Sequence, residues 1–273
     1  MAEKAKGHQG PQGRVLCRLA LSLASLAGAC AAGPAGAWTP GTQVTIGREA
    51  ARLAPADLRR QLAKHKKVFE EGITAPFQDT DPTRHAKNAD GSGQLDRVIE
   101  AEVKKAIDAI RGHQPFAAVV HQLGVVSHFV ADANNPLATS SSDREEGRYF
   151  ADFLRYAESS EPRLPVVFYG LERRLDRGRD LSPLIAATLQ RGRGFYPLVG
   201  REYRRIGFAS GSGGFDDRST AFGVVSLALS HAVTDVTQAL RHIWLKAGGA
   251  DDREQIPERG TRIVVLRRIS STR

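Results

Sequence analysis

The stretch HQLGVVSHFVADANNPLATS, residues 121–140, joins an apolar helical pattern to a defined helix end. Apolar side chains fill most positions as far as Ala133, and Asn-Asn-Pro follows as a stop signal. Two polar side chains, His128 and Asp132, interrupt the apolar run four residues apart. At about 100° per residue they share one helix face with His121. The stretch therefore predicts a buried helix that carries a polar site.

The pair formed by His128 and Asp132 has two explanations. Burying an unpaired carboxylate costs several kcal/mol, so Asp132 needs a cation or hydrogen-bond donors. A metal ion bound by both side chains meets that need. A polar network in the core, in which the two residues contact each other or an arginine, meets it as well, and spacing alone favours this network. Gly124, on the same helix, would let another backbone approach closely.

The rest of the chain reads as helices joined by loops. Apolar residues at helical spacing, with helix start and stop signals, predict helices over residues 53–72, 95–111, 115–133, 143–158, 181–206 and 216–249. Residues 72–94 are loop-like, and the helix over 181–206 is either continuous or broken at Gly192, Gly194 and Pro197. The string RIVVLRR near the C-terminus suits an edge strand or a docking segment. Without strand–helix alternation in the sequence, we predict an all-α multi-helix bundle.

The N-terminus is typical of an export signal. Four basic residues within the first 18 precede the apolar run LALSLASLAGACAA, residues 19–32, which has the size of a signal-peptide core. AGA at residues 35–37 supplies the small residues that precede a cleavage site. We therefore assign 1–37 to a signal peptide, 38–249 to a single α-helical domain and 250–273 to a polar tail, and expect a secreted or periplasmic protein after cleavage between Ala37 and Trp38. An uncleaved apolar anchor and a lipoprotein signal at Cys30 remain alternatives.

Cysteine content and charge restrict how the mature protein is stabilised and what it contacts. Both cysteines lie in the predicted leader, so the mature chain would depend on core packing, on metal, or on both. Beyond the leader we expect no segment apolar and long enough to span a bilayer. The chain carries 39 basic and 30 acidic residues. This mild positive balance suits contact with an anionic surface, although solvated surface charge is the simpler explanation.

The string LGVVSHFVADANNP resembles the central motif of the zinc-dependent phospholipase C / P1 nuclease family. Trp38, at the predicted cleavage site, matches the tryptophan with which members begin. The segment EGITAPFQDTDPTRHAKNADGSG, residues 71–93, resembles a loop that supplies one aspartate and one histidine ligand. The resemblance covers residues 38–158 and is compatible with a long C-terminal helix.

This resemblance implies an α-helical bundle that holds up to three zinc ions. Zinc lowers the pKa of bound water and neutralises phosphate oxygens, so the implied activity is hydrolysis of phosphodiesters, in phospholipid or in nucleic acid. The residues that match the family's ligands are Trp38, through its α-amino and carbonyl groups, His85, His128, Asp132 and Asp79. Asp81 is an alternative to Asp79, whose further expected role is that of general base.

The sequence departs from the family pattern at several ligand positions. Gln43 stands where members have histidine, and a neutral amide is a poor zinc ligand. Ala138 replaces a second histidine. Arg148 and Asp152 stand where a histidine and an acid complete another zinc site, and a guanidinium cannot ligate. We therefore predict at most one zinc ion, and we keep a non-catalytic member of the fold, acting as a binding or envelope protein, as the alternative to a hydrolase.

Two further features have a functional and a structural interpretation. His231 and Asp235, four residues apart on the last long helix, are either a replacement ligand pair or a polar contact in the core. The run RGRGFYPLVGREYRR, residues 191–205, mixes arginines with aromatic residues. It fits an anion or nucleic-acid surface, and it fits a solvated amphipathic helix more simply.

Overall fold

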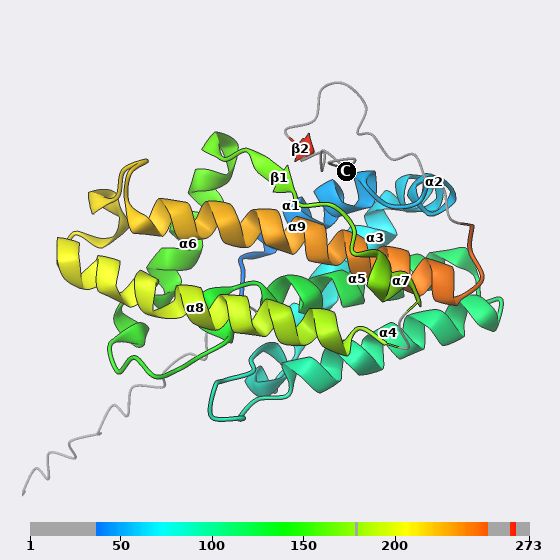
Figure 1. Cartoon of the computed structure of the whole chain (residues 1–273), viewed down its shortest axis with the longest axis horizontal. Coiled ribbons are helices and arrows are strands. Elements are labelled where there is room, and N and C mark those ends of the chain that lie inside the picture. Colours follow the sequence, from blue (N-terminus) through cyan, green and yellow to red (C-terminus); the bar gives the residue numbers. More distant parts are fainter. Residues whose placement is uncertain (1–36, 178–179, 251–262, 266–273) are drawn as a thin grey trace, which may run out of the picture. The chain divides into compact units, whose positions relative to one another are not determined.

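The computed structural model describes residues 37–177, 180–250 and 263–265. The predicted leader, apart from Ala37, and most of the polar tail lie outside these ranges, so cleavage and export stay predictions. Within the described ranges helices dominate, and the predicted all-α class is confirmed (Figure 1). The α-helices are α1 (Pro40–Arg52), α2 (Ala56–Lys64), α3 (Lys66–Thr74), α4 (Leu95–Arg111), α5 (Phe116–Ala133), α6 (Phe150–Ser160), α7 (Arg173–Arg177), α8 (Ser182–Ile206) and α9 (Thr220–Lys246).

Short elements join these helices. Single turns of 3₁₀ helix are η1 (Ala75–Gln78), η2 (Pro82–His85), η3 (Pro136–Ala138), η4 (Glu146–Arg148), η5 (Glu161–Arg163) and η6 (Gly211–Gly214). Strand β1 (Val166–Phe168) pairs in parallel with β2 (Ile263–Val265). The segment RIVVLRR therefore does contribute a strand, whereas its partner β1 was not predicted.

Several predicted helix boundaries were wrong. The helix expected over 53–72 is two helices, because the chain leaves helical geometry at His65, with φ −108° and ψ 32°. Helix α1 was not predicted, although Thr39 caps its start by accepting a hydrogen bond from the Thr42 N–H. Helix α6 begins at Phe150 rather than near residue 143.

Of the two possibilities for residues 181–206, the structure shows the continuous helix. Helix α8 runs through Pro197, with Tyr196 and Tyr203 buried along its inner face. Gly192 is required by packing, because a Cβ there would lie 2.5 Å from Thr139 Cγ2. Tertiary burial thus outweighs the local helix-breaking signals.

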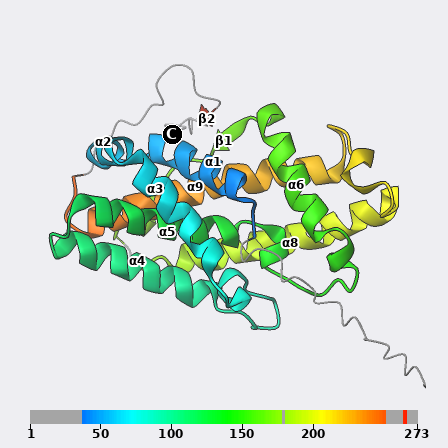
Figure 2. The same ribbon diagram turned by 180° about the vertical axis from the view of Figure 1, so that it is seen from behind.

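Helices α5 and α9 form the centre of the core. Helix α5 packs against α3, α4 and α9, and α9 packs also against α1 and α8 (Figures 1 and 2). By length and composition both helices are apolar and long enough to cross a membrane, which corrects the expectation that no segment beyond the leader would be. In each, 67% of the apolar window is buried inside the protein, as in the core helix of a globular domain, so the apolar composition is weak grounds for a membrane span.

The crossing of α3 and α5 is unusually close and positions the polar site. A Cβ atom on Gly124 would lie 2.3 Å from the Phe69 carbonyl oxygen, and one on Gly72 would lie 2.1 Å from the His121 carbonyl oxygen. The approach expected at Gly124 is therefore confirmed, and Gly72 lies within α3 rather than after it. This backbone contact brings the end of α3 against His128.

Candidate metal centre

Three side chains converge inside the bundle. His128 and Asp132 project from α5, and His85 ends η2. The Asp132 Oδ2 atom lies 2.7 Å from His85 Nδ1 and 3.1 Å from His128 Nε2, and the two nitrogens are 3.3 Å apart. Their relative exposures are 4% for His85 and 0% for the other two. The structure thus assembles the three residues that the sequence placed at the centre of a zinc site.

The geometry of this cluster fits one metal ion. Ligands at about 2.0 Å around a tetrahedral zinc ion are separated by about 3.3 Å. Of the observed separations of 2.7, 3.1 and 3.3 Å, the shortest needs about 0.6 Å of expansion and the others about 0.2 Å or none. Among the described residues, His85, His128 and Asp132 form the one group of three or more potential ligands close enough to share an ion. Two imidazole nitrogens and a carboxylate oxygen are also the donor types that zinc prefers.

A backbone contact fixes the tautomer of His128. Its Nδ1 atom lies 2.8 Å from the Ile73 carbonyl oxygen. A carbonyl only accepts, so Nδ1 carries the hydrogen and Nε2 presents a lone pair to the cluster in the neutral ring. The close α3–α5 crossing holds Ile73 in place, so the glycine contact and the ligand geometry are coupled.

Both oxygens of Asp132 are engaged. Oδ2 meets the two histidines, while Oδ1 accepts hydrogen bonds from Gln43 Nε2 at 2.6 Å and from the Ala37 N–H at 3.1 Å. Burial raises the pKa of Asp132, but its interactions with His128 and His85 together outweigh burial and lower the pKa to about 2. The carboxylate is therefore ionised at neutral pH, as a metal ligand must be.

Gln43 therefore has a donor role in place of the ligand role of a histidine. In a chain that retains Ala37, replacing Gln43 with alanine leaves Oδ1 of Asp132 with the Ala37 N–H alone. In a chain cleaved after Ala37, Oδ1 would lose both donors. A hydrogen bond to a buried charge contributes about 1.5–3 kcal/mol, so we expect the free energy of unfolding to fall by about 2 kcal/mol in urea denaturation. Zinc stoichiometry should not change, because Oδ2 keeps its position. Gln190→Ala, at an exposed position of α8, is the control. Equal stability of the two variants would contradict this role for Gln43.

Asp79 lies beside His85 but outside the group of three. Its Oδ2 atom accepts a hydrogen bond from Arg84 Nε at 2.7 Å and lies 3.5 Å from His85 Nε2. His85 directs Nδ1 at the cluster, so Asp79 faces the opposite edge of the imidazole. The alternative, Asp81, accepts from the N–H and hydroxyl of Thr83 and caps η2. A ligand or base role for Asp79 stays a prediction, and in this conformation Asp79 could act only beside the cluster.

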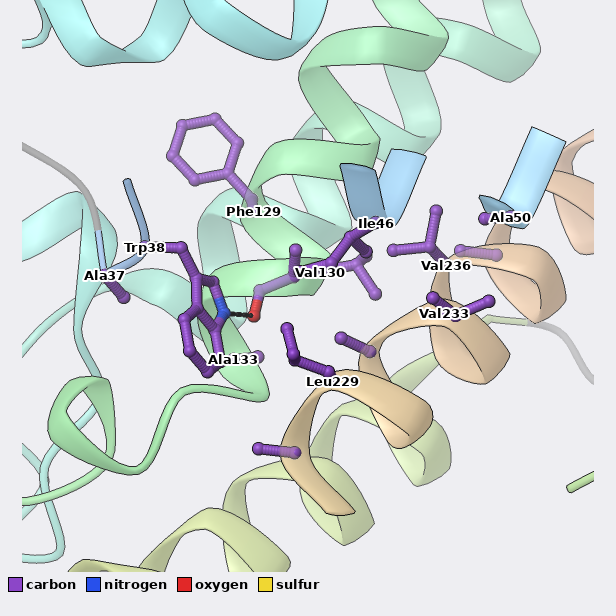
Figure 3. Close-up of a cluster of buried hydrophobic side chains, with 14 of the residues drawn as sticks. Ala37, Trp38, Ile46, Ala50, Phe129, Val130, Ala133, Leu229, Val233 and Val236 are labelled. Atoms are coloured by element: carbon purple, nitrogen blue, oxygen red, sulfur yellow. Dashed lines mark hydrogen bonds between the residues drawn. The ribbon is translucent and has the colours of Figure 1, made fainter. Parts of the chain in front are cut away.

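Trp38 lies in the core near the cluster. Its ring packs with Ile46, Val130 and Leu229 where α1, α5 and α9 meet, and its Nε1–H donates to the Ala131 carbonyl at 2.8 Å (Figure 3). The backbone group that reaches Asp132 is the N–H of Ala37, one residue earlier. Metal ligation by the Trp38 backbone would need cleavage after Ala37, and both stay predictions.

The remaining family ligand positions are occupied by other interactions. Asp152 Oδ2 accepts from the Tyr203 hydroxyl at 2.8 Å and from the Ser212 N–H at 2.7 Å. The Arg148 guanidinium lies 3.9 Å over the ring of Phe208. Ala138 is buried and offers no side-chain donor. The side chains at these positions therefore take part in hydrogen-bonded and aromatic contacts.

The other histidine candidates lie outside the group of three ligands. Asp235 accepts hydrogen bonds from Thr188 and Arg191, and His231 stacks on Tyr169. His121 is likewise not a member of the ligand group. In the run 191–205 the two tyrosines are buried, so they cannot form a stacking platform for nucleic acid.

Comparison with known proteins supports the fold. No family model and no curated protein matches the sequence. Among solved structures, the alpha-toxin of Clostridium perfringens, from the avian strain SWCP, is similar, with a TM-score of 0.53 and 14% identity. The similarity covers 79% of this chain and 67% of the toxin chain. It shows the all-α phospholipase C fold.

Proposed function

We propose that this protein binds one zinc ion through His85, His128 and Asp132, and that the ion stabilises a non-catalytic member of the phospholipase C fold with a binding or envelope role. The observation that carries the proposal is the near-complete burial of all three ligands, with both oxygens of Asp132 already engaged. A bound ion would tie η2 to α5 and, through Asp132, to the segment that precedes α1.

The surroundings of the cluster support a structural ion. The rings of Phe77 and Phe129 lie 4.9 and 5.3 Å from the His128 ring, which places apolar groups around the ligands. Zinc would supply positive charge to the buried carboxylate and hold the two imidazoles. The second and third ions of the family pattern lack support, because Gln43, Ala138 and Arg148 cannot take the required ligand roles.

A second candidate is the exported phosphodiester hydrolase implied by the resemblance, acting on phospholipid or nucleic acid. It is favoured by the Arg84–Asp79 pair beside His85, whose side chains are 35% and 28% exposed. The guanidinium could bind a phosphate group, and the carboxylate could accept a proton from a water molecule. This pair is where the buried cluster comes close to solvent-accessible polar groups.

Metal content and turnover distinguish the two functions. We expect about one zinc ion per purified mature chain, a lower melting temperature after chelation, recovery of that temperature when zinc is restored, and no cleavage of a chromogenic phosphodiester. A zinc-free chain with an unchanged melting temperature on zinc addition would contradict the structural proposal. Zinc-dependent turnover that is lost in both His128→Ala and Asp79→Ala would establish the hydrolase instead.

A further inference from the structure

A large cavity lies apart from the metal centre. It has a volume of about 730 Å³ and is lined by the segment that links β1 to α7, by α7 itself, and by α8 and α9. None of the three proposed zinc ligands lines it. Small-molecule sites have volumes of about 300–1,000 Å³, so the cavity has the capacity for an organic ligand.

One wall carries a fixed arginine. Asp235, at 5% exposure, accepts hydrogen bonds from Thr188 Oγ1 at 2.8 Å and from Arg191 Nη2. The same Arg191 nitrogen lies 3.3 Å from Asn134 Oδ1. Within the described chain no hydrogen bond engages Nε or Nη1 of Arg191, which lines the cavity. An arginine oriented through one nitrogen, with further donors available, is suited to bind a carboxylate or phosphate group.

A flat, largely apolar surface lies next to this arginine. The ring of Tyr169 stacks on that of His231 with a centroid distance of 4.2 Å and an interplanar angle of 19°. Burial and the nearby Arg191 charge lower the pKa of His231 to about 4, so the ring is neutral at neutral pH. Leu184 and Ala187 of α8 add apolar lining.

The position of Tyr169 is fixed by α9. The N–H groups of Val167, Tyr169 and Glu172 donate to side-chain oxygens of Ser230, Thr234 and Gln238 at 3.1, 3.2 and 2.8 Å. The three acceptors stand four residues apart on α9, so they form one row along the helix. The wall is therefore preformed in the fold, which lowers the entropic cost of binding.

We infer that this cavity binds a small aromatic anion, whose carboxylate or phosphate group is held by Arg191 and whose ring packs against the Tyr169–His231 pair. The charged residues at the rim of the cavity also favour an anionic ligand. Glu172 pairs with Arg174, and Asp235 pairs with Arg191, while Arg173 adds a further cation to the lining. The site shares no ligand with the metal centre, so this inference does not depend on zinc binding.

Titration calorimetry with 1-naphthoate and 1-naphthyl phosphate tests the site on the full mature protein. We expect at least one of the two to bind, and the neutral 1-naphthalenemethanol to bind at least tenfold more weakly. Stronger binding of the phosphate would identify phosphate monoesters as the ligand class, and stronger binding of the carboxylate would identify aromatic acids. Failure of both anions to bind would overturn the inference.

Two variants locate the binding. Arg191→Lys keeps a positive charge beside Asp235 but loses the planar fork, so affinity should fall at least tenfold. Ala187→Trp, at an exposed position of the lining, places an indole in part of the cavity beside Arg191 and should weaken binding at least tenfold. Arg59→Gln, a remote change, should have no effect. The melting temperature and zinc content of each variant report folding. Binding that is unchanged in both Arg191→Lys and Ala187→Trp would place the ligand elsewhere and contradict the inference.

Discussion

Replacing Asp132 with alanine is expected to abolish zinc binding and to lower the free energy of unfolding of the metal-free chain by about 3–5 kcal/mol. The change removes the buried acceptor that meets Gln43 Nε2, both histidines and, in a chain that retains Ala37, the Ala37 N–H. Each buried donor left without a partner costs about 1–3 kcal/mol. Urea denaturation measures the stability, and elemental mass spectrometry measures the zinc content.

Two further variants make this result specific. Asp132→Asn keeps the shape and one acceptor oxygen, so it should lose zinc with a smaller loss of stability and remain measurable if the alanine variant fails to fold. Asp79→Ala is the matched control, because Asp79 is a carboxylate that contacts the far edge of His85 and is 28% exposed. It should retain zinc. Loss of zinc in Asp79→Ala with retention in Asp132→Asn would reverse the assignment of ligands.

Replacing Gly124 with alanine is expected to have a comparably large effect on stability. The added Cβ would lie 2.3 Å from the Phe69 carbonyl oxygen and 2.8 Å from the Ile73 nitrogen, both backbone atoms that cannot rotate away. Helices α3 and α5 must then separate, at a cost of about 3 kcal/mol or more. Because the Ile73 carbonyl orients His128, we also expect weaker zinc binding, measured by competition with a chelator.

Gly194→Ala is the control for this prediction. Gly194 lies within α8, and no heavy atom outside its local helix surroundings lies within 4 Å of an added Cβ. Alanine should therefore stabilise the helix by up to about 1 kcal/mol. The explanation of the α3–α5 crossing would be wrong if Gly124→Ala, like Gly194→Ala, unfolded at the same urea concentration as the wild type or at a higher one.

The centre of the site could be predicted because its signals are local. His128 and Asp132 lie one helical turn apart, so their shared face follows from helix geometry. Gly124 is a local signal as well, because a residue without a side chain lets another backbone approach the helix closely. His85 came from the family-like loop, and the structure brings it to within hydrogen-bond distance of Asp132.

The groups that orient the cluster could not be predicted in the same way. The Ile73 carbonyl and the Ala37 N–H are backbone atoms, which carry no residue-type signal, and they reach the site only through the packing of α3 and of the segment before α1. Gln43 was recognised as a lost ligand, but its donor role depends on the position of Asp132 Oδ1. The sequence also does not show which edge of the His85 ring faces Asp79, because this orientation depends on the fold of the loop.

Two features of the secondary structure, the continuity of α8 and the strand β1, could not be settled from the sequence for a common physical reason. Gly192 and Pro197 are local signals for a helix break, yet burial of Tyr196 and Tyr203 against the core keeps α8 continuous. Strand β1 is three residues long and depends on a partner that lies 97 residues later in sequence, since Val166 pairs with Ile263. Both the continuity of α8 and the formation of β1 depend on contacts between residues far apart in the sequence, which a local sequence pattern does not reveal.

Anomalous diffraction at the zinc absorption edge, from crystals of the purified mature protein grown with zinc, tests the central claim most directly. The account predicts one strong peak per chain, enclosed by His85 Nδ1, His128 Nε2 and Asp132 Oδ2. Two or three peaks that extend toward Gln43 or Asp152, or no peak among the three ligands, would contradict a single buried zinc site.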